Sequence, residues 1–248
     1  MTDFAVVIPA RYASERLPGK PLRDIAGKPM LQHVHEKALS SGAAEVVIAM
    51  DDERILKAAD SFQADCCMTS ADHQTGTDRL AEVAVSRQWP DERIIVNLQG
   101  DEPLMPAELI GQCAVLLDDE SADIATLASS LQSSADFENP NIVKVVTDER
   151  GFALYFSRAG IPFPRSAERS KLAWRTALHH HGIYAYRCSV LKTLVAAPQS
   201  RLELCEQLEQ LRALSLGLQI RVGVPDIRPG PGVDTEKDLR QVERVLAS

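Results

Sequence analysis

Residues 4–22 of this 248-residue chain read FAVVIPARYASERLPGKPL. The first six are apolar and predict a short buried strand, and the loop that follows carries three cationic side chains. Beyond the loop, apolar residues recur at helical spacing from Met30 to Ala38, and Gly42 stops the predicted helix. A buried strand followed by an amphipathic helix is the first unit of an α/β fold.

The same alternation continues through the first half of the chain. Strands are expected at 46–50, 66–68 and 94–98, and helices at 55–62, 80–84 and 106–117. This alternation predicts βαβ units and a central, mostly parallel sheet with helices on both faces. Because ligands bind at the carboxyl ends of parallel strands, sites are expected after Pro9, Met68 and Leu98.

The second half is more mixed and forms a smaller lobe in this prediction. Strands are expected at 124–131, 143–147, 153–156, 182–187 and 220–224, and helices at 190–194 and 204–214. The last helix is expected to begin at Thr235, with Thr235 as its N-cap and Asp238 completing a capping-box-like start.

Composition argues against several classes of function. The net charge of −8 disfavours bulk binding to nucleic acid, which requires a basic surface. Neither a signal peptide nor a membrane span is expected, since the apolar runs fall far short of about 20 residues. The five cysteines lack metal-ligand spacing and are expected to be buried reduced thiols of a cytoplasmic protein.

The loop after the first strand holds Arg11, Arg16, Gly19 and Lys20. Arginine offers a planar fork to phosphate, lysine a compact charge, and glycine a close backbone approach. The loop therefore predicts a triphosphate site, with a solvated basic turn as the alternative. It matches neither GxxxxGK[ST] nor GxGxxG, which argues against a P-loop and against an NAD-type site.

This loop, from Ile8 to Leu22, resembles the signature of the 3-deoxy-D-manno-octulosonate (Kdo) cytidylyltransferases, the CMP-Kdo synthetases. Further segments resemble that family in the same order, at 72–79, 97–104, 139–146, 155–158, 180–187, 208–212 and 231–235. The resemblance implies a single nucleotidyltransferase domain of Rossmann-like fold over 1–248. Within it we expect a nucleotide-binding half (1–130), a sugar-binding and dimerisation half (131–225), and a C-terminal metal motif with a closing helix (226–248).

The resemblance also implies the reaction. CTP and Kdo are expected to give CMP-Kdo and pyrophosphate, activating Kdo for lipopolysaccharide synthesis, in a cytoplasmic homodimer. Another acidic sugar, such as amino-Kdo or a sialic acid, is the nearest alternative, because the phosphate loop does not distinguish between them. A non-catalytic nucleotide-sugar regulator is a second alternative, which the intact Lys20, Asp101 and Asp234 disfavour.

The predicted metal site combines two aspartates. Asp101 follows a buried strand and a glycine, at the sheet edge that faces the phosphate loop. A lone acid in a turn is usually just solvated, but Mg²⁺ needs few oxygen ligands from protein when phosphates supply others. Asp234 lies in a Gly/Pro-rich loop before the last helix, and the resemblance implies that both aspartates hold a catalytic Mg²⁺.

The resemblance assigns the CTP phosphates to Arg11 and Lys20. Residues 75–79 are expected to read the pyrimidine, with Arg79 donating to the base carbonyl; helix capping by Thr77 or Asp78 is the alternative. The residues expected to be catalytic are Arg11, Lys20, Asp101 and Asp234. Those expected to contact CTP are Ala10, Arg11, Lys20, Thr75, Gly76, Thr77, Arg79 and Gln99.

The sugar is expected to contact Arg16, Gln99, Arg158, His180, Tyr184, Glu209 and Gln210, all taken from the resemblance. A solvated helix face is the alternative for Glu209 and Gln210. Within the triplet 179–181, only the spacing to Gly182 selects His180. The polar segment 164–178 has the character of a mobile flap, and no site residue is expected in it.

Overall fold

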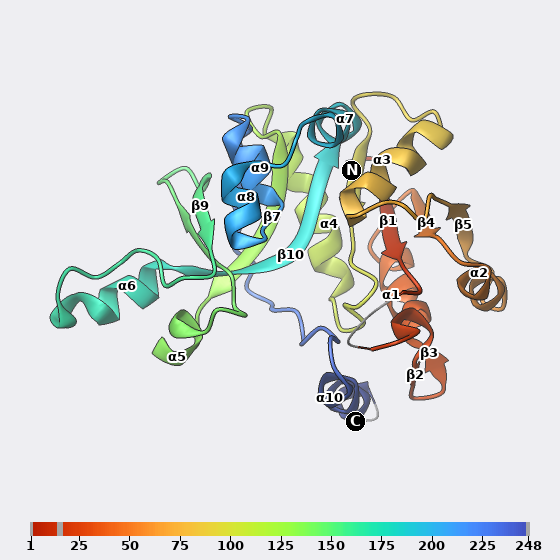
Figure 1. Ribbon diagram of the computed structural model, residues 1–248, viewed down its shortest axis with the longest axis horizontal. Helices are drawn as coiled ribbons and strands as arrows, with labels where there is room; N and C mark the ends of the chain where they lie inside the picture. Colours follow the sequence, from red (N-terminus) through yellow and green to blue (C-terminus); the bar gives the residue numbers. More distant parts are fainter. Residues whose placement is uncertain (1, 14–16, 247–248) are drawn as a thin grey trace.

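The computed structural model describes residues 2–13 and 17–246. One nine-stranded sheet runs through this part of the chain, with the main strand order β11-β7-β10-β6-β1-β4-β5 (Figure 1). Its strands are β1 (Phe4–Ala10), β4 (Glu45–Met50), β5 (Asp65–Met68), β6 (Ile94–Asn97), β7 (Ile124–Ser130), β8 (Lys144–Thr147), β9 (Ala153–Ser157), β10 (Leu178–Arg187) and β11 (Ile220–Gly223).

The predicted mostly parallel sheet is confirmed. Strand β1 pairs in parallel with β4 and β6, β4 with β5, and β11 with β7. The antiparallel pairs involve β10, which runs antiparallel to β6, β7 and β8, and the β8–β9 pair of the smaller lobe. The apolar runs of the first half become the buried parallel strands because such strands are covered on both faces.

Helices cover both faces of the sheet. Successive residues of a strand point to opposite faces, so Val6 and Ile8 pack in one core cluster while Val7 packs in another. The first cluster includes Leu31 and Ile110, and the second includes Leu80. The helices of this part are α1 (Met30–Leu39), α2 (Glu53–Asp60), α3 (Gly76–Ser86), α4 (Ala107–Val115) and α7 (Cys188–Ala196).

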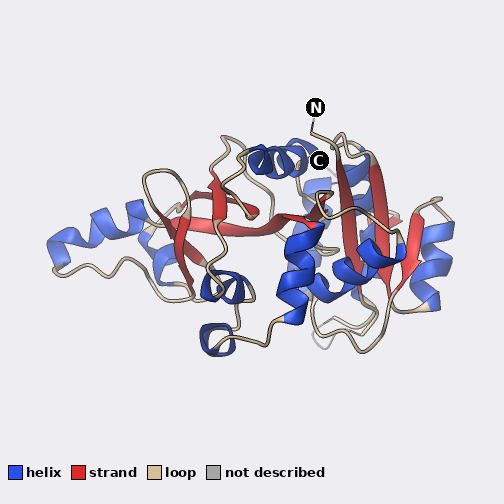
Figure 2. Cartoon of the chain, turned by 90° about the horizontal axis from the view of Figure 1, so that it is seen from above, coloured by secondary structure: helices blue, strands red, loops and turns tan. Residues whose placement is uncertain are grey.

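Strand β10 connects the parallel core to the smaller lobe. Its end pairs with β6 from Tyr184 to Arg187, whereas its beginning pairs with β8 at Leu178 and His179. The register with β7 shifts between His181 and Tyr184. Helices α5 (Ser134–Glu138) and α6 (Ser170–Thr176) belong to the smaller lobe, and α6 lies on an arm at its far end (Figures 1 and 2).

The single helix expected at 204–214 is wrong. The structure has two helices here, α8 (Arg201–Glu206) and α9 (Gln210–Ser215). Gln207 between them has a left-handed backbone with φ of 52° and ends α8. Leucines continue at helical spacing through the break, so the apolar pattern conceals it.

Two further segments differ from the prediction. Strand β10 begins at Leu178 and not at 182, so it includes the histidine triplet. The segment 164–178, expected to be a polar flap, contains a short 3₁₀ helix (Ala167–Arg169) and α6. The sequence also gave no sign of the small hairpin of β2 (Asp24–Ile25) and β3 (Lys28–Pro29).

The last helix, α10 (Glu236–Leu246), begins as predicted. Thr235 Oγ1 accepts a hydrogen bond from Asp238 N at 3.3 Å, and Asp238 Oδ2 accepts one from Thr235 N at 2.9 Å. Leu239 and Val242 pack with Ile25 of the hairpin, which fixes the end of the chain beside the phosphate loop. Within the described ranges, no helix is long and apolar enough to cross a membrane.

Candidate active site

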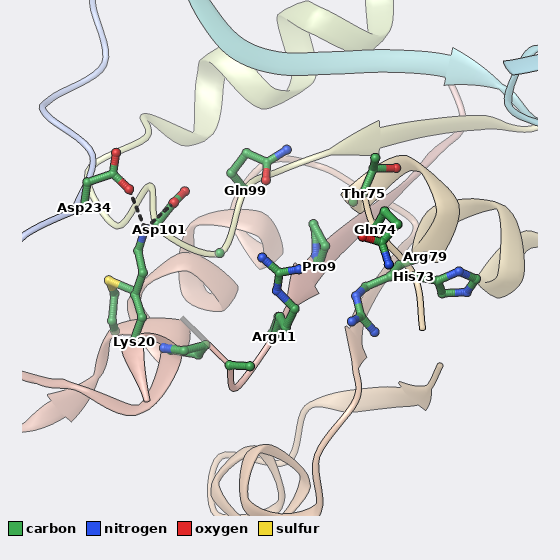
Figure 3. Close-up of a pocket in the computed structure, with 16 residues that line it drawn as sticks. Pro9, Arg11, Lys20, His73, Gln74, Thr75, Arg79, Gln99, Asp101 and Asp234 are labelled. Atoms are coloured by element: carbon green, nitrogen blue, oxygen red, sulfur yellow. Dashed lines mark hydrogen bonds and ion pairs between the residues drawn. The ribbon is translucent and has the colours of Figure 1, made fainter. Parts of the chain in front are cut away.

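A cavity of about 290 Å³ lies where the loops after β1, β5 and β6 meet, at the carboxyl ends of these strands (Figure 3). Figure 3 shows Lys20, Asp101 and Asp234 at one end and Thr75, Gln74 and Arg79 at the other, with Arg11 and Gln99 between them. The lining residues are Pro9, Ala10, Arg11, Ala13, Lys20, Pro21, Met30, His73, Gln74, Thr75, Gly76, Arg79, Gln99, Gly100, Asp101 and Asp234.

At one end of the cavity, two carboxylates converge on one ammonium. Lys20 Nζ lies 2.6 Å from Asp101 Oδ2 and 2.9 Å from Asp234 Oδ1. Burial alone would lower the pKa of Lys20, but the charges and hydrogen bonds of Asp101 and Asp234 outweigh it and raise that pKa. Lys20 therefore carries its positive charge in the free protein.

Backbone contacts bring Asp234 to this point. Val233 N donates to Asp101 O at 2.9 Å, which ties the 230–234 loop to the loop after β6. A side chain at Gly232 would place its Cβ 2.8 Å from Glu102 Oε1, so a larger residue here would displace the Glu102 carboxyl. Burial, reinforced by the neighbouring Asp101, raises the pKa of Glu102 to about 8, so this carboxyl is mostly protonated at neutral pH.

Of the three cations expected in the phosphate loop, Lys20 and Arg11 line the cavity. Within the described part of the chain, no side chain forms a hydrogen bond or ion pair with the Arg11 guanidinium, which is exposed to the cavity. The expected sugar ligand Arg16 lies outside the described residues.

The loop before α3 serves as a helix cap. Thr75 Oγ1 accepts a hydrogen bond from Asp78 N at 3.2 Å, and Asp78 Oδ2 accepts one from Thr75 N at 3.0 Å. The N-cap is thus Thr75, and neither Thr77 nor Asp78, the two residues given as the capping alternative, although Asp78 completes the capping box. Thr77 is buried and lines the second cavity described below, together with Glu209, and not the first.

Arg79 lines the cavity but is already engaged in a buried ion pair. It donates to Thr69 Oγ1 at 2.7 Å, to Ser70 O at 3.1 Å and to Asp51 Oδ2 at 2.6 Å. Asp51 Oδ1 also accepts from Tyr12 N at 3.1 Å. Asp51 therefore joins the phosphate loop to the loop that carries Thr75, and it fixes Arg79 between them.

A second cavity, of about 310 Å³, adjoins the first, because Gln99 lines both. Five of the seven expected sugar residues line it, namely Gln99, His180, Tyr184, Glu209 and Gln210. The Tyr184 hydroxyl and Glu209 Oε1 are buried and have no hydrogen-bond partner among the described residues. Such polar atoms are costly to bury unless a ligand or water completes them, so they indicate a binding site.

The histidine triplet is mostly buried and uncharged. His179 and His180 line the second cavity, whereas His181 does not. His180 Nε2 lies 3.1 Å from Thr126 Oγ1, and His181 Nε2 lies 3.1 Å from Ser129 Oγ. Burial lowers the pKa of His180 and of His181 to about 3, so neither carries charge at neutral pH.

Arg158, the other expected sugar residue that does not line the second cavity besides Arg16, also does not line the first as the described residues form it. Its guanidinium donates to the backbone carbonyls of Glu206 at 2.8 Å, Pro140 at 3.3 Å and Gln207 at 3.5 Å. In this arrangement Arg158 contacts the loops that surround the second cavity.

A cation-lined cavity beside a cavity with unpartnered polar groups suits a nucleotide and a polar second substrate. A model of the cytidylyltransferase family matches residues 5–220. The chain belongs to the cytidylyltransferase family. This confirms the assignment made from the loop motifs.

Several curated relatives of this cytidylyltransferase carry the name 3-deoxy-manno-octulosonate cytidylyltransferase. The protein of Vibrio campbellii is 51% identical over 247 residues, which cover 99% of this chain and 98% of the relative. That of Vibrio cholerae has the same identity and coverage. A protein of Actinobacillus pleuropneumoniae, with the suffix 1 to the same name, is 50% identical over 99% of this chain and all of its own.

Solved structures of cytidylyltransferases show the same fold. The structure of CMP:2-keto-3-deoxy-manno-octonic acid synthetase complexed with CTP superposes with a TM-score of 0.90 at 45% identity, covering 99% of this chain and 98% of that one. A cytidylyltransferase from Leptospira borgpetersenii gives a TM-score of 0.64 at 16% identity over 100% of this chain and 87% of that one, which shows the fold alone.

Two residues of this cytidylyltransferase site escaped the sequence reasoning. Asp51 directly follows a buried strand, and the rule applied to Asp101 would have selected it. Glu102 stands next to Asp101 in a motif that the sequence did single out, but no local pattern distinguishes a buried carboxyl from a solvated one.

Proposed function

We propose that this enzyme transfers the cytidylyl group of CTP to Kdo, giving CMP-Kdo and pyrophosphate and so activating Kdo for lipopolysaccharide synthesis. The observation that carries the proposal is the pair of adjoining cavities joined at Gln99. One offers cations and carboxylates to a triphosphate, and the other offers buried hydroxyl-binding groups. Full-length relatives about half identical to this chain are named for this activity.

The chemistry requires positioning more than covalent help from the protein. The C2 hydroxyl of Kdo attacks the α-phosphorus of CTP; a new P–O bond forms as the bond to the β-phosphate oxygen breaks and pyrophosphate leaves. The Arg11 guanidinium has no ion-pair partner among the described residues and Lys20 has a charged ammonium, and both can stabilise the negative charge on the phosphates.

We propose Asp101 and Asp234 as ligands of Mg²⁺. Their oxygens converge on one cation, the Lys20 ammonium, so the two side chains are already arranged around a positive charge. Among the described residues, no three His, Cys, Asp or Glu side chains gather as a metal site, so phosphates and water would supply the other ligands, as Mg²⁺ prefers. When bound, Mg²⁺ supplies charge neutralisation and polarises the phosphate.

For the sugar, we propose contacts from Gln99, His180, Tyr184, Glu209 and Gln210. A neutral His180 can both donate and accept hydrogen bonds, which suits a polyhydroxylated ligand. Burial raises the pKa of Glu209, and its Oε1, which has no partner among the described residues, is available to a sugar hydroxyl. The carboxylate of the sugar would then be met by Arg16 of the phosphate loop.

We also propose that two copies associate through the smaller lobe. Its arm exposes Phe163 and Leu172 with 87% and 63% of their surface accessible, and β9 exposes Leu154 with 62%. Apolar exposure of this kind is unfavourable unless a partner covers it. Light scattering should give the mass of a dimer for the native chain and of a monomer for Phe163→Ser with Leu172→Ser.

We place the reaction in the cytoplasm, a proposal that the five unpaired cysteines support, since disulfides are rare in reducing compartments.

Pyrophosphate release tests the proposed reaction. CTP, UTP, ATP and GTP are each offered with Kdo, amino-Kdo and a sialic acid, and each is run once without sugar as the control. We expect efficient pyrophosphate release only from the pair CTP and Kdo. Efficient release with a different acidic sugar would show that this sugar, and not Kdo, is the substrate. No release with any pair would favour a nucleotide-sugar regulator.

A further inference from the structure

We propose that Lys144 and Glu206 are positioning residues for the sugar, although neither lines the cavity. Together with the Arg158 backbone and side chain, they join two segments that both line it, the turn at Asn141 and residues 208–210. The inference rests on the proposed function in assigning the second cavity to the sugar.

Lys144 is a wholly buried lysine whose partners are backbone oxygens. Its Nζ donates to the carbonyls of Asn139 at 2.8 Å, Ile142 at 2.5 Å and Arg158 at 2.6 Å, and its exposed fraction is 0%. An ammonium has three hydrogens, so all of its donors are satisfied. The first two carbonyls bracket the turn that presents Asn141 to the second cavity.

Glu206 makes the corresponding contacts from the other side. It is the last residue of α8, and its carboxylate accepts from Ser157 Oγ at 2.7 Å and from Arg158 N at 2.9 Å. The end of β9 is thereby fixed to the end of α8. The left-handed Gln207 comes next, followed directly by the cavity residues 208–210.

Arg158 connects the two halves of this network. Its carbonyl accepts from Lys144, its amide donates to Glu206, and its guanidinium donates to the carbonyls of Pro140 and Gln207. The turn that carries Asn141 and the segment that carries Glu209 are therefore held by the same residue. Removing one buried partner leaves several carbonyls or donors unsatisfied, so both loops are expected to shift.

The test compares Lys144→Met and Glu206→Gln with a matched control, Arg187→Met. Arg187 also donates to buried carbonyls, those of Leu117 at 2.7 Å and Ala122 at 2.6 Å, but at the far end of β10. We expect the KM for Kdo to rise about tenfold in the two test variants, while the KM for CTP changes by less than about twofold. The control should have a lower melting temperature, but its KM for Kdo should not rise relative to its KM for CTP.

Hydrogen exchange supplies a second readout that needs no sugar. In the free Lys144→Met and Glu206→Gln variants, amides of residues 139–143 and 207–211 should exchange faster, whereas those of the phosphate loop should not. If Lys144→Met fails to fold, Glu206→Gln decides, because it keeps the size of the side chain.

Unchanged KM values in a folded test variant, an equal rise in both, or unchanged exchange at 139–143 and 207–211 would each overturn the proposal. Should Kdo prove not to be the substrate, the exchange comparison still decides whether the network holds the loops.

Discussion

Lys20 and Arg11 lie in one loop but differ in their partners. Lys20 is shared by Asp101 and Asp234, whereas Arg11 has no ion pair within the described part of the chain. Among the described residues that line the cavity, the charges of Asp101 and Asp234 are balanced by those of Lys20 and Arg11, although the chain as a whole carries −8. A triphosphate therefore meets local cations first, and the net charge has less influence at this short distance.

Asp101→Asn and Asp234→Asn are each expected to lower kcat by about 10²-fold or more, because each removes one of only two carboxylates from this end of the cavity. The fold should persist, since both side chains are at least one-third exposed. Steady-state pyrophosphate release and circular dichroism measure the two effects. Asp65→Asn, which breaks an exposed ion pair with Arg87, is the control. If a variant kept most of its turnover, the substituted aspartate would not be required for the reaction.

The neighbouring Asp51 and Asp52 offer a matched comparison. Asp51→Asn leaves the buried Arg79, whose side chain is 3% exposed, without its counter-charge and should cost about 3–5 kcal/mol of unfolding free energy. Asp52→Asn should cost much less, because Asn is also a good N-cap and the Asp52–Arg54 pair is exposed. Urea unfolding measures both. Equal losses of unfolding free energy in the two variants would show that the buried Asp51–Arg79 pair contributes no more to stability than the exposed Asp52–Arg54 pair.

At the scale of elements, the sequence predicted the parallel core well because its strands are buried on both faces and appear as plain apolar runs. It failed where the signal is conformational. Gln207 adopts a left-handed backbone. A glycine at this position would have predicted the end of the helix, but Gln207 does not, and the leucines on either side continue the helical spacing. Helix α6 was missed because the polar run 165–171 obscures its start and because, of its described residues, Ala173 alone is buried, so no apolar face recurs at helical spacing.

The candidate site shows the same division. The three loops at the carboxyl ends of β1, β5 and β6 could be located from topology, and they do line one cavity. The motifs also supplied residues of the second cavity. Tertiary relations such as the Asp51–Arg79 pair, or the path of Arg158 toward backbone carbonyls, leave no trace in a local pattern.

Helices α8 and α9 are joined by a buried ion pair. Arg212 donates to Glu203 at 2.9 and 2.5 Å, and the side chains are 7% and 5% exposed. Arg212→Met should lower the unfolding free energy by about 3–5 kcal/mol, since it strands the Glu203 charge. The double variant Arg212→Met with Glu203→Leu should recover much of that loss. Denaturant unfolding of both variants tests this, and a double variant no better than the single one would contradict it.

Strand β10 should make stability depend on pH. The pKa of His181 falls from 6.5 to about 3 on folding, so the unfolded chain binds the proton more tightly. The neutral ring is favourable above pH 6.5, and that stability is lost as pH falls toward 3. Relative to wild type, His181→Gln should lose about 1.5 kcal/mol less between pH 6.5 and 5. Urea titrations at both pH values measure this, and parallel losses would show that His181 is accessible to protons in the folded state.

At the scale of the whole molecule, the chain closes its site from distant parts. Residue 20 comes from the first loop, residue 101 from the middle of the chain and residue 234 from the segment before α10. The second cavity is lined by β10 and the smaller lobe together with Thr77, Asn97 and Gln99, and among the described lining residues Gln99 is shared with the first cavity. Substitutions in one lobe should therefore affect one substrate, provided that the lobes keep their relative position.

Tyr184→Phe tests this division together with its cost to folding. The Tyr184 side chain is buried in the second cavity, and its hydroxyl has no partner among the described residues. An unsatisfied buried hydroxyl opposes folding, so its removal should leave the unfolding free energy unchanged or raise it by up to about 1 kcal/mol. If the Tyr184 hydroxyl forms a hydrogen bond with the bound sugar, the KM for Kdo should rise about tenfold while the KM for CTP stays constant.

Tyr186→Phe is the matched control for this substitution. Tyr186 lines the same cavity, but among the described residues its hydroxyl is not a buried group without a partner, so its removal should cost up to about 1 kcal/mol of stability instead of raising it. Thermal unfolding and two-substrate kinetics measure the stability and the KM for Kdo of both variants. We expect Tyr184→Phe to keep its stability and lose affinity for Kdo, and Tyr186→Phe to lose stability. A Tyr184→Phe protein that lost stability and kept its KM for Kdo would show that the hydroxyl serves the fold. In that case the second cavity would have to bind the sugar through Gln99, Glu209 and Gln210 without it.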